Sequence, residues 1–593
     1  MPASVMSPAA PLKDMKTTAQ SRRLIVFFCL LALVLGGTEA WLSRNDMYSD
    51  GISYMDIGDA FSQGHWNELV NAYWSPLYPM LLGTAASVLK PSAGWQFATV
   101  HLVNFLLYLV ALACFHCFLV SLIQYRGGRP SDQTSRGWWI PVGYTLFLWT
   151  TLRLISVSVV SPDMAVAASI YGAAAALLRI KTDLAQFQHF ALLGLALGLG
   201  YLAKAPMFPM SIVFLGLSWF AAKNSRRAFR GLLIALAVFS LIAGSYIAAL
   251  SRQQGHLTFG ESAKLNYGWY VNHLPRYHWQ GEQPGSGMPA HADRKIFDSP
   301  PIYTFDQPVR GTYPIWKDPG YWFDGVRMHV DPRGNVLQVI ENSDIYYDVL
   351  FRSQPLFALA FVTLLLWSDS AREFPRRLLR EWILWAPPLC ALSMFALVHV
   401  EARMIGAYIV ILWLGLFAGL TLPPGRVVAS VGTALAGVVI AALCISDLGE
   451  IKSHGIAFFF RGDNSSSPPQ QIAAALGRLG IHQGDRVAWI RPQAFDQKQN
   501  YWWARIANIQ ISSEVPAGQG DRFWSVPETV REQALQSIAR TGVRAMIATS
   551  APSGTLSEEW QPLGKTGYLT LMLDSRAASL VSPVSNSGAT LSK

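Results

Sequence analysis

Four aspartates stand close together just after the first long apolar run of the chain. They fall within 14 positions, and they are Asp46, Asp50, Asp56 and Asp59. Asp50, Tyr54 and Ile57 recur at helical spacing, which predicts a helix lying along a membrane surface. A carboxylate in that place can take the proton of an attacking hydroxyl group or hold a divalent metal ion. The alternative is structural, because Ser49 and Asp50 are types that favour helix N-termini and acids also keep a loop in water.

Other charged residues lie at the ends of later apolar runs. Asp163 begins one run, Lys204 ends another, and His399, Glu401 and Arg403 stand together just before a third. Arginine offers two parallel donors and lysine a point charge, and both suit a phosphate group. Each residue also has a structural interpretation. An acid favours the start of a helix, a lysine reaches from a helix end toward water, and Glu401 with Arg403 can be a simple ion pair.

Composition identifies the environment of these residues. Of the 593 residues only 14% are charged, against about 25% in soluble proteins, while 51% are hydrophobic. This excludes a disordered chain, a coiled coil and a disulfide-stapled secreted domain. The net charge of +10 comes from basic residues gathered in short gaps between apolar runs, as at 126–136, 223–230 and 372–380. That pattern is typical of cytoplasmic loops, and without any binding motif it does not indicate nucleic acid.

The apolar runs predict an all-α polytopic membrane bundle of about 11 transmembrane helices. Candidate segments are 24–42, 76–89, 95–125, 138–160, 162–178, 190–203, 205–222, 231–250, 355–368, 382–400, 404–421 and 427–446. Placing every basic gap in the cytoplasm leaves no full crossing for 76–89, which is short and has prolines near its start. We therefore expect a half-embedded helix there. The outer loops 43–75 and 251–354 and the chain beyond 446 then face away from the cytoplasm.

The last part of the chain has the pattern of an α/β domain. Two units share one design, in which a helix ends at a glycine and a strand follows: 470–479 with 486–490, and 527–540 with 544–548. Alternating helices and strands predict a parallel sheet. The expected organisation is a cytoplasmic segment 1–23, a membrane domain 24–446 and a soluble extracytoplasmic α/β domain 447–593. No glycine-rich nucleotide-binding motif is present.

The motifs occur in an order that resembles a known group. Asp50-x-x-x-Tyr54 is followed by the run 74–79, then by 160–163 (Val-Ser-Pro-Asp), 198–206 with Lys204, and 399–403. In this order they resemble the C-superfamily glycosyltransferases, which use polyprenyl-phosphate sugars. That group includes the protein O-mannosyltransferases, the aminoarabinose transferase and the Rgt-type lipopolysaccharide glycosyltransferases. The resemblance covers roughly residues 24–446.

The resemblance implies roles for individual residues. It assigns Asp50 as a base or a carboxylate near a metal, and Asp163 as a second acid on the acceptor side. Lys204 and Arg403 would contact the phosphate, and Tyr54, His399 and Glu401 would belong to the substrate site. A divalent metal ion is compatible with this site, but no residue is identified as its ligand. Two positions depart from the group: Trp74-Ser75 replace a glutamate, and Met404 replaces an aromatic residue.

The expected function is therefore transfer of a sugar from a polyprenyl-phosphate donor to an extracytoplasmic glycan, lipid or protein. A multi-pass protein of a bacterial-type inner membrane, with its site and tail on the periplasmic side, follows from that interpretation. Two alternatives stay open. A secondary transporter would show inverted repeats and charges in mid-helix, and the sequence shows neither. A non-catalytic envelope-assembly protein would use the tail to bind a partner.

Overall fold

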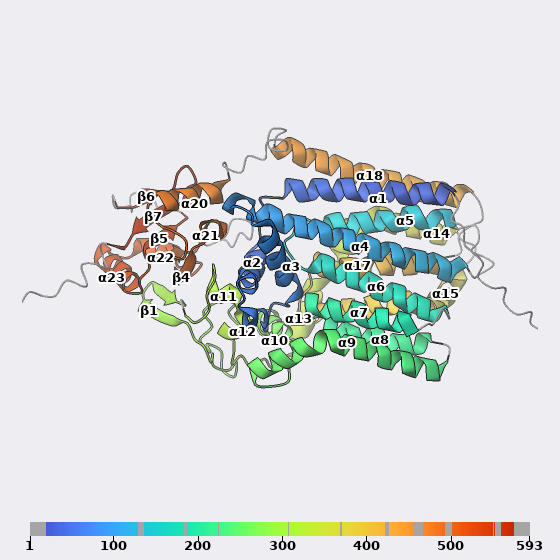
Figure 1. Ribbon diagram of the computed structural model, residues 1–593, viewed down its shortest axis with the longest axis horizontal. Coiled ribbons are helices and arrows are strands. Elements are labelled where there is room, and N and C mark those ends of the chain that lie inside the picture. Colours follow the sequence, from blue (N-terminus) through green and yellow to red (C-terminus); the bar gives the residue numbers. More distant parts are fainter. Residues whose placement is uncertain are drawn as a thin grey trace, which may run out of the picture.

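The computed structural model describes residues 19–127, 136–182, 187–222, 224–305, 307–367, 371–420, 426–454, 467–492, 501–549, 551 and 559–574. Figure 1 shows a bundle of long helices at one end of the molecule and a small sheet at the other, with α2 and α3 between them. Most of the predicted segment 1–23 lies outside the described residues, since the first helix begins at Ala19.

The bundle consists of helices that match the predicted apolar runs. They are α1 (Ala19–Leu42), α4 (Gln96–Gly127), α5 (Arg136–Trp149), α6 (Asp163–Lys181), α7 (Phe187–Ala203), α8 (Met207–Ala221), α9 (Ser225–Gln254), α14 (Pro355–Trp367), α16 (Trp382–Ala396), α17 (Ala402–Gly419) and α18 (Arg426–His454). Within the described residues six helices are long and apolar enough to cross a membrane, or seven if the bent pair 332–352 and 355–367 forms one span. The chain is thus a multi-pass membrane protein, and eleven crossings stay a prediction.

The predicted span 138–160 is shorter in the structure. Helix α5 ends at Trp149, a π-helical turn covers Thr150–Leu154, and an irregular segment continues to the start of α6. The amide of Asn104 on α4 donates to the carbonyl oxygens of Val157 and Val159, at 3.2 and 3.1 Å. These bonds hold the segment as an irregular turn at the bundle's outer edge, directly before Asp163.

The helix predicted after the first span is present, and its place along the membrane surface stays a prediction. It is α2 (Ser49–Ser62), followed by a short turn η1 (Trp66–Leu69) and by α3 (Leu77–Leu89), the element expected to be half embedded. The two helices touch backbone to backbone at Gly58 and Gly83. A Cβ at Gly83 would lie 2.2 Å from the Gly58 carbonyl oxygen, so no larger residue fits there without a shift. This contact fixes α2 on the bundle.

The long outer segment 251–354 is folded and not an open loop. It contains α10 (Ser262–Tyr270), the strands β1 (Arg294–Asp298) and β2 (Pro301–Thr304), the single turns α11 (Pro314–Lys317) and α12 (Pro319–Trp322), α13 (Pro332–Tyr347) and the π-turn η5 (Asp348–Arg352). Short elements elsewhere are η2 (Ala93–Trp95), η6 (Ala371–Glu373) and α15 (Phe374–Arg380). A single apolar core joins α2, this segment and the tail through residues such as Tyr54, Trp316 and Trp503.

The tail contains both predicted units, α20 with β3 and α23 with β5, together with further elements. Its helices and strands are α20 (Pro468–Arg478), β3 (Arg486–Ile490), α21 (Trp502–Ala507), β4 (Gln510–Val515), α22 (Gly520–Ser525), α23 (Glu528–Ala539), β5 (Ala545–Ala548), β6 (Gln561–Pro562) and β7 (Leu569–Met572). The sheet runs in the order β1-β2-β4-β3-β5-β7-β6. Strand β3 is parallel to β4 and β5, as predicted, but the other pairs are antiparallel.

The sheet is therefore mixed, and the prediction of a parallel sheet was wrong. The physical reason is that two edges are completed by hairpins, one of which comes from the outer segment: β2 pairs with β4 through Tyr303–Glu514 and Thr304–Ser513. Helix α18 also continues to His454, past the expected end at 446. The division into domains at 446 stays a prediction, but the tail does not build its sheet alone.

Candidate functional site

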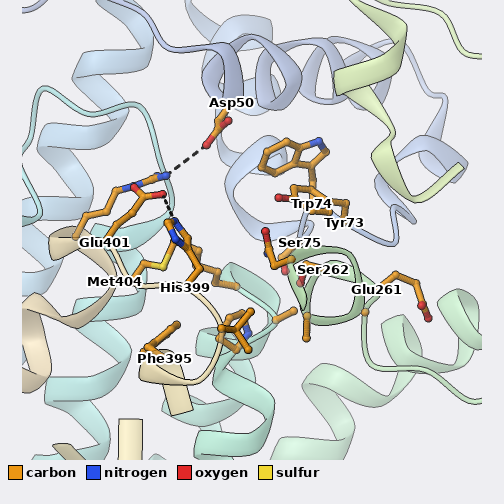
Figure 2. Close-up of a pocket in the computed structure, with 18 of the residues that line it drawn as sticks. Asp50, Tyr73, Trp74, Ser75, Glu261, Ser262, Phe395, His399, Glu401 and Met404 are labelled. Atoms are coloured by element: carbon orange, nitrogen blue, oxygen red, sulfur yellow. Dashed lines mark hydrogen bonds and ion pairs between the residues drawn. The ribbon is translucent and has the colours of Figure 1, made fainter. Parts of the chain in front are cut away.

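A cavity of about 750 Å³ opens where α2, α10 and α11 meet the ends of α7, α8, α16 and α17. Of the residues predicted for a site, Asp50, Tyr54, Lys204, His399, Glu401 and Arg403 line it. Figure 2 shows Asp50 pointing from α2 toward His399 and Glu401, with Tyr73, Trp74 and Ser75 on the neighbouring wall. Residues separated by more than 350 positions in the sequence are thus brought to one place.

Arg403 is the centre of the charged cluster in this cavity. Its Nη2 lies 3.4 Å from Asp50 Oδ2, its Nη1 lies 3.2 Å from Asp163 Oδ2, and its Nε lies 2.6 Å from Glu401 Oε2. The guanidinium presents five N–H donors in a fixed plane, so its three nitrogen atoms can each face a different carboxylate. Arg403 therefore orients the three acids that surround it.

Asp163 holds the second cation of the cluster. Its Oδ1 lies 2.6 Å from Lys204 Nζ, while its Oδ2 faces Arg403. The Asp163 side chain is only 1% exposed and does not line the cavity. Both oxygens are occupied by cations, so the geometry favours a positioning role for Asp163, and its predicted part as a second acid receives no support.

Glu401 and His399 form the far wall of the cluster. His399 Nε2 lies 3.2 Å from Glu401 Oε1, and the imidazole stacks on Tyr270 at 3.9 Å with the rings nearly parallel. Burial raises the pKa of Glu401, but Arg403 and His399 outweigh this effect and hold that pKa well below its usual range. Glu401 thus stays an anion and keeps Arg403 in place.

Asp50 is held from the opposite side by the outer segment. Trp316 Nε1 donates to Asp50 Oδ1 at 3.1 Å. The Trp316 carbonyl in turn accepts from Ser53 Oγ at 2.9 Å and from Trp74 Nε1 at 3.0 Å. The carboxylate is 28% exposed and faces the cavity, which is the arrangement that a proton acceptor needs.

Tyr54 lies one helical turn after Asp50 and packs into the wall. Its ring contacts Trp74 and Tyr78 edge to face, at 4.9 and 5.1 Å between ring centroids. Tyr78 donates to Asn104 Oδ1 at 2.6 Å, which connects this stack to the turn before α6. Tyr54 therefore aligns the helix that carries Asp50, and only part of its surface reaches the cavity.

Sequence reasoning missed Arg276, a third cation in the cavity wall. It donates from Nη2 to the Tyr270 hydroxyl at 2.7 Å and lies over the rings of Trp269 and Tyr270, at 5.6 and 5.2 Å. Among the described residues no carboxylate forms an ion pair with it, whereas Lys204 and Arg403 are already paired. Arg276 stands in an irregular segment with no spacing pattern, so no local signal pointed to it.

The tail buttresses the helix that carries Asp50. Arg505 on α21 contacts two carboxylates of α2, with Nη1 2.8 Å from Asp56 Oδ1 and Nη2 2.6 Å from Asp59 Oδ2. Asp56 also accepts from the backbone and hydroxyl of Thr312. The Tyr501 hydroxyl donates to the carbonyl of Ser49 at 3.4 Å, directly beside Asp50.

A network of buried charges connects the tail to the part of the cavity wall that contains Tyr277. Glu514 on β4 accepts from His278 Nε2 at 2.5 Å and from the Tyr313 hydroxyl at 2.7 Å. Arg491 lies 3.5 Å from Glu514 and 4.2 Å from the centre of the Tyr277 ring, which lines the cavity. Burial opposes the charge on His278, but Glu514 and Asp293 raise its pKa to about 9, so it stays a cation at neutral pH.

The carboxylates of the cluster are the candidates for metal ligands in this cavity. Asp50, Asp163 and Glu401 each face Arg403, and a metal ion would have to displace that guanidinium. In the part of the chain that the structure describes, no group of three or more His, Cys, Asp or Glu side chains is arranged to hold a metal ion. The structure assigns no metal ligand.

Fold and site together define a multi-pass membrane protein with a charged pocket at one edge of its bundle. No protein-family model and no curated protein matches the chain. Two solved structures are similar. ArnT from Cupriavidus metallidurans bound to undecaprenyl phosphate shares 13% identity over 95% of this chain and 100% of its own, with a TM-score of 0.47. The Archaeoglobus fulgidus oligosaccharyltransferase in complex with zinc and sulfate shares 11% over 89% and 68%, with a TM-score of 0.45.

Both structures come from the group that the sequence resembles, the C-superfamily glycosyltransferases. At these identities and TM-scores the likeness carries no conclusion about activity.

Proposed function

We propose that the chain is an integral-membrane glycosyltransferase that moves a sugar from a polyprenyl-phosphate donor to an extracytoplasmic acceptor. The observation that carries this proposal is the convergence of Asp50, Lys204, Arg276 and Arg403 on one cavity at the edge of the bundle. A carboxylate and several cations are the groups needed to accept a proton and to hold a leaving phosphate. The order of the motifs along the sequence supports the same function.

In the proposed reaction the acceptor hydroxyl attacks the anomeric carbon of the donor sugar. A bond forms between the acceptor oxygen and the sugar, and the bond between the sugar and the phosphate oxygen breaks. The electron pair leaves with the lipid phosphate, whose charge Lys204, Arg403 and Arg276 would stabilise. Asp50 would take the acceptor proton, while Glu401 and Asp163 hold the two paired cations in position.

The shape of the cavity supports a lipid-linked donor. Five neighbouring lining residues of α8 and α16 and the turn after α16 are apolar: Phe208, Pro209, Met394, Phe395 and Val398. The cations Lys204, Arg276 and Arg403 and the Asp50 carboxylate line other parts of the cavity. A polyprenyl phosphate has the same division between an apolar chain and an anionic head. We infer that the isoprenoid enters along the apolar wall and that its phosphate stops at the cations.

The donor can be tested with purified protein. We expect transfer of a radiolabelled sugar from a polyprenyl-phosphate carrier to an envelope extract and none from the corresponding nucleotide sugar, because the described residues include no nucleotide-binding glycine motif. Transfer from the nucleotide sugar without any lipid carrier would contradict the proposal. Transport of the sugar-lipid without covalent transfer would favour the transporter alternative.

Arg276 is expected to bind donor phosphate more than it assists proton transfer. In Arg276→Met the cavity loses the cation that has no carboxylate partner among the described residues, so the KM for the donor should rise about 10-fold or more while kcat falls less. Arg276→Lys should recover part of the loss, since it keeps the charge but not the fork. The control variant is Arg252→Met, because Arg252 lies near the end of α9 and does not line the cavity. Unchanged donor KM in Arg276→Met would exclude this role.

The proposed orientation places the cavity and the tail on the periplasmic side of a bacterial-type inner membrane. It can be tested with single cysteines at Met288 in the outer segment and Leu379 in α15, which are 69% and 65% exposed. An impermeant thiol reagent applied to whole cells should label Met288→Cys and leave Leu379→Cys unlabelled until the membrane is opened. Labelling at Leu379→Cys alone would show that the chain has the opposite orientation. The unsubstituted chain, whose five cysteines lie in bundle helices, is the blank.

A further inference from the structure

A second, smaller cavity lies behind α2, on the side away from Asp50. Its volume is about 190 Å³, and α2, α3, the start of α4 and α21 enclose it. Its polar lining residues are Asp59, Lys90, Gln96, Thr99 and Arg505. Asp59 follows Asp50 by nine residues, which is half a turn around a helix, so the two carboxylates serve different cavities. No residue of this second cavity takes part in the proposed transfer.

Two polar atoms of the lining are buried and have no hydrogen-bond partner among the described residues. They are Gln96 Oε1, an acceptor, and Arg505 Nε, a donor. Buried polar atoms in native proteins nearly always have a partner, so a cavity that holds two of them indicates a polar ligand. Such a ligand must offer both a donor and an acceptor.

The cavity lies at the depth where lipid headgroups are found. Trp41 at the outer end of α1 and Trp95 just before α4 are both exposed, and their rings lie 6.5 Å apart. Exposed tryptophans at the ends of spanning helices mark the membrane–water interface. Val88 and Leu89, at the end of α3 beside Lys90, are also exposed, as apolar residues that face lipid would be.

The charges of the lining fit a zwitterion better than an anion. Lys90 and Arg505 supply two positive charges, and Asp59 together with Asp56, which binds Arg505 from behind, supplies two negative ones. A phosphate alone would be opposed by these carboxylates, and a group without an N–H or O–H donor would leave Gln96 Oε1 unsatisfied. A phosphate and a primary ammonium side by side satisfy both.

We propose that this cavity binds the phosphoethanolamine headgroup of a membrane lipid. The phosphate lies between Lys90 and Arg505 Nε, and the ammonium donates to Gln96 Oε1 and to the Asp59 carboxylate. The lipid tails extend past Val88 and Leu89 into the bilayer. The site is independent of the proposed transfer reaction, but α2 lines both cavities and Arg505 of the second cavity holds that helix.

The test uses the full chain in detergent, incubated with short-chain phosphatidylethanolamine, phosphatidylcholine or phosphatidylglycerol. Lipid that stays bound is counted by native mass spectrometry. We expect retention of phosphatidylethanolamine at least about 10-fold above the other two, since each charge-assisted hydrogen bond contributes about that factor. Lys90→Ala and Gln96→Leu should each lose this preference, and Lys295→Ala, at an exposed lysine of β1, should keep it. Thermal unfolding of each variant shows that the fold is intact.

Two results would overturn the proposal. One is equal retention of the three lipids by the unsubstituted protein, which would mean that the cavity does not select a headgroup. The other is unchanged retention in both Lys90→Ala and Gln96→Leu, which would place the lipid elsewhere. Displacement of the lipid by soluble phosphoethanolamine at equal concentration would show that the chemistry is correct but that a membrane lipid is not its source.

Discussion

Asp50→Asn is expected to slow sugar transfer by about 10²–10⁴-fold, which is the usual contribution of a general base. The amide keeps the size of the side chain, and its oxygen can still accept from Trp316 Nε1, but it cannot take a proton. Arg403 retains Asp163 and Glu401 as partners in this variant, so the cluster should stay assembled. The measurement is the single-turnover rate of transfer from the lipid donor, with thermal unfolding as the check on folding.

Asp46→Asn is the matched control, because Asp46 belongs to the same group of acids but is exposed outside the cavity. It should transfer at the unsubstituted rate. Asp56 and Asp59 are unsuitable controls, since they hold Arg505. If Asp50→Asn transfers sugar as fast as the unsubstituted protein, Asp50 is not the base. A parallel loss of activity and folding in Asp50→Asn and Asp46→Asn would mean that these acids are structural.

Arg505→Met should destabilise the outer part of the molecule by about 3–5 kcal/mol, because it leaves a buried carboxylate without its cation. Burial already raises the pKa of Asp56, and Arg505 and Lys317 oppose that effect. Loss of Arg505 raises this pKa further. The melting temperature, followed by tryptophan fluorescence, should fall by roughly 5–15 °C.

The sign of the pH dependence identifies the cause. An unpaired Asp56 has a higher pKa in the folded than in the unfolded state, so the folded state loses stability as pH rises through that range. The deficit of Arg505→Met should therefore be larger at pH 8 than at pH 5. The double variant Asp56→Asn/Arg505→Met removes the unpaired charge and should recover part of the loss.

Arg544 provides a comparison with the same chemistry at the surface. It also bridges two carboxylates, Asp485 and Asp574, but the three side chains are 35%, 23% and 53% exposed, whereas Arg505 and Asp56 are 7% and 4% exposed. Arg544→Met should change the melting temperature little, because exposed ion pairs contribute little. Equal effects of Arg505→Met and Arg544→Met would show that burial does not explain the stabilising effect of the contacts between Arg505 and α2.

The sequence predicts what depends on local pattern and misses what depends on distant pairing. The α2 helix followed from the spacing of Asp50, Tyr54 and Ile57, and β3 and β5 followed from the glycines that end the helices before them. Strand β1 carries no such pattern, since its residues are largely exposed. Its hairpin is specified by pairing with β4, more than 200 positions away, and no local signal encodes that contact.

The candidate site divides in the same way. Asp50, Lys204 and Arg403 stand at the ends of apolar runs, where a charge is conspicuous, and the structure brings them to one cavity. Arg276 and Trp316 stand in a segment where aromatic and basic residues are common, so their types alone did not distinguish them. Their position depends on α10 and α11, whose packing against α2 only the folded chain shows.

The pairing of β2 with β4 also constrains how the chain is threaded through the bilayer. Hydrogen-bonded strands lie on the same side, so the number of crossings between residues 304 and 510 must be even. The helices α14, α16, α17 and α18 are four predicted crossings and satisfy this parity, so failed insertion of any one of them would leave β2 and β4 on opposite sides of the membrane. During synthesis the β1–β2 hairpin emerges first and must wait, with an open edge, until the last helix has been inserted. With this topology the sheet can close only after these helices have been inserted.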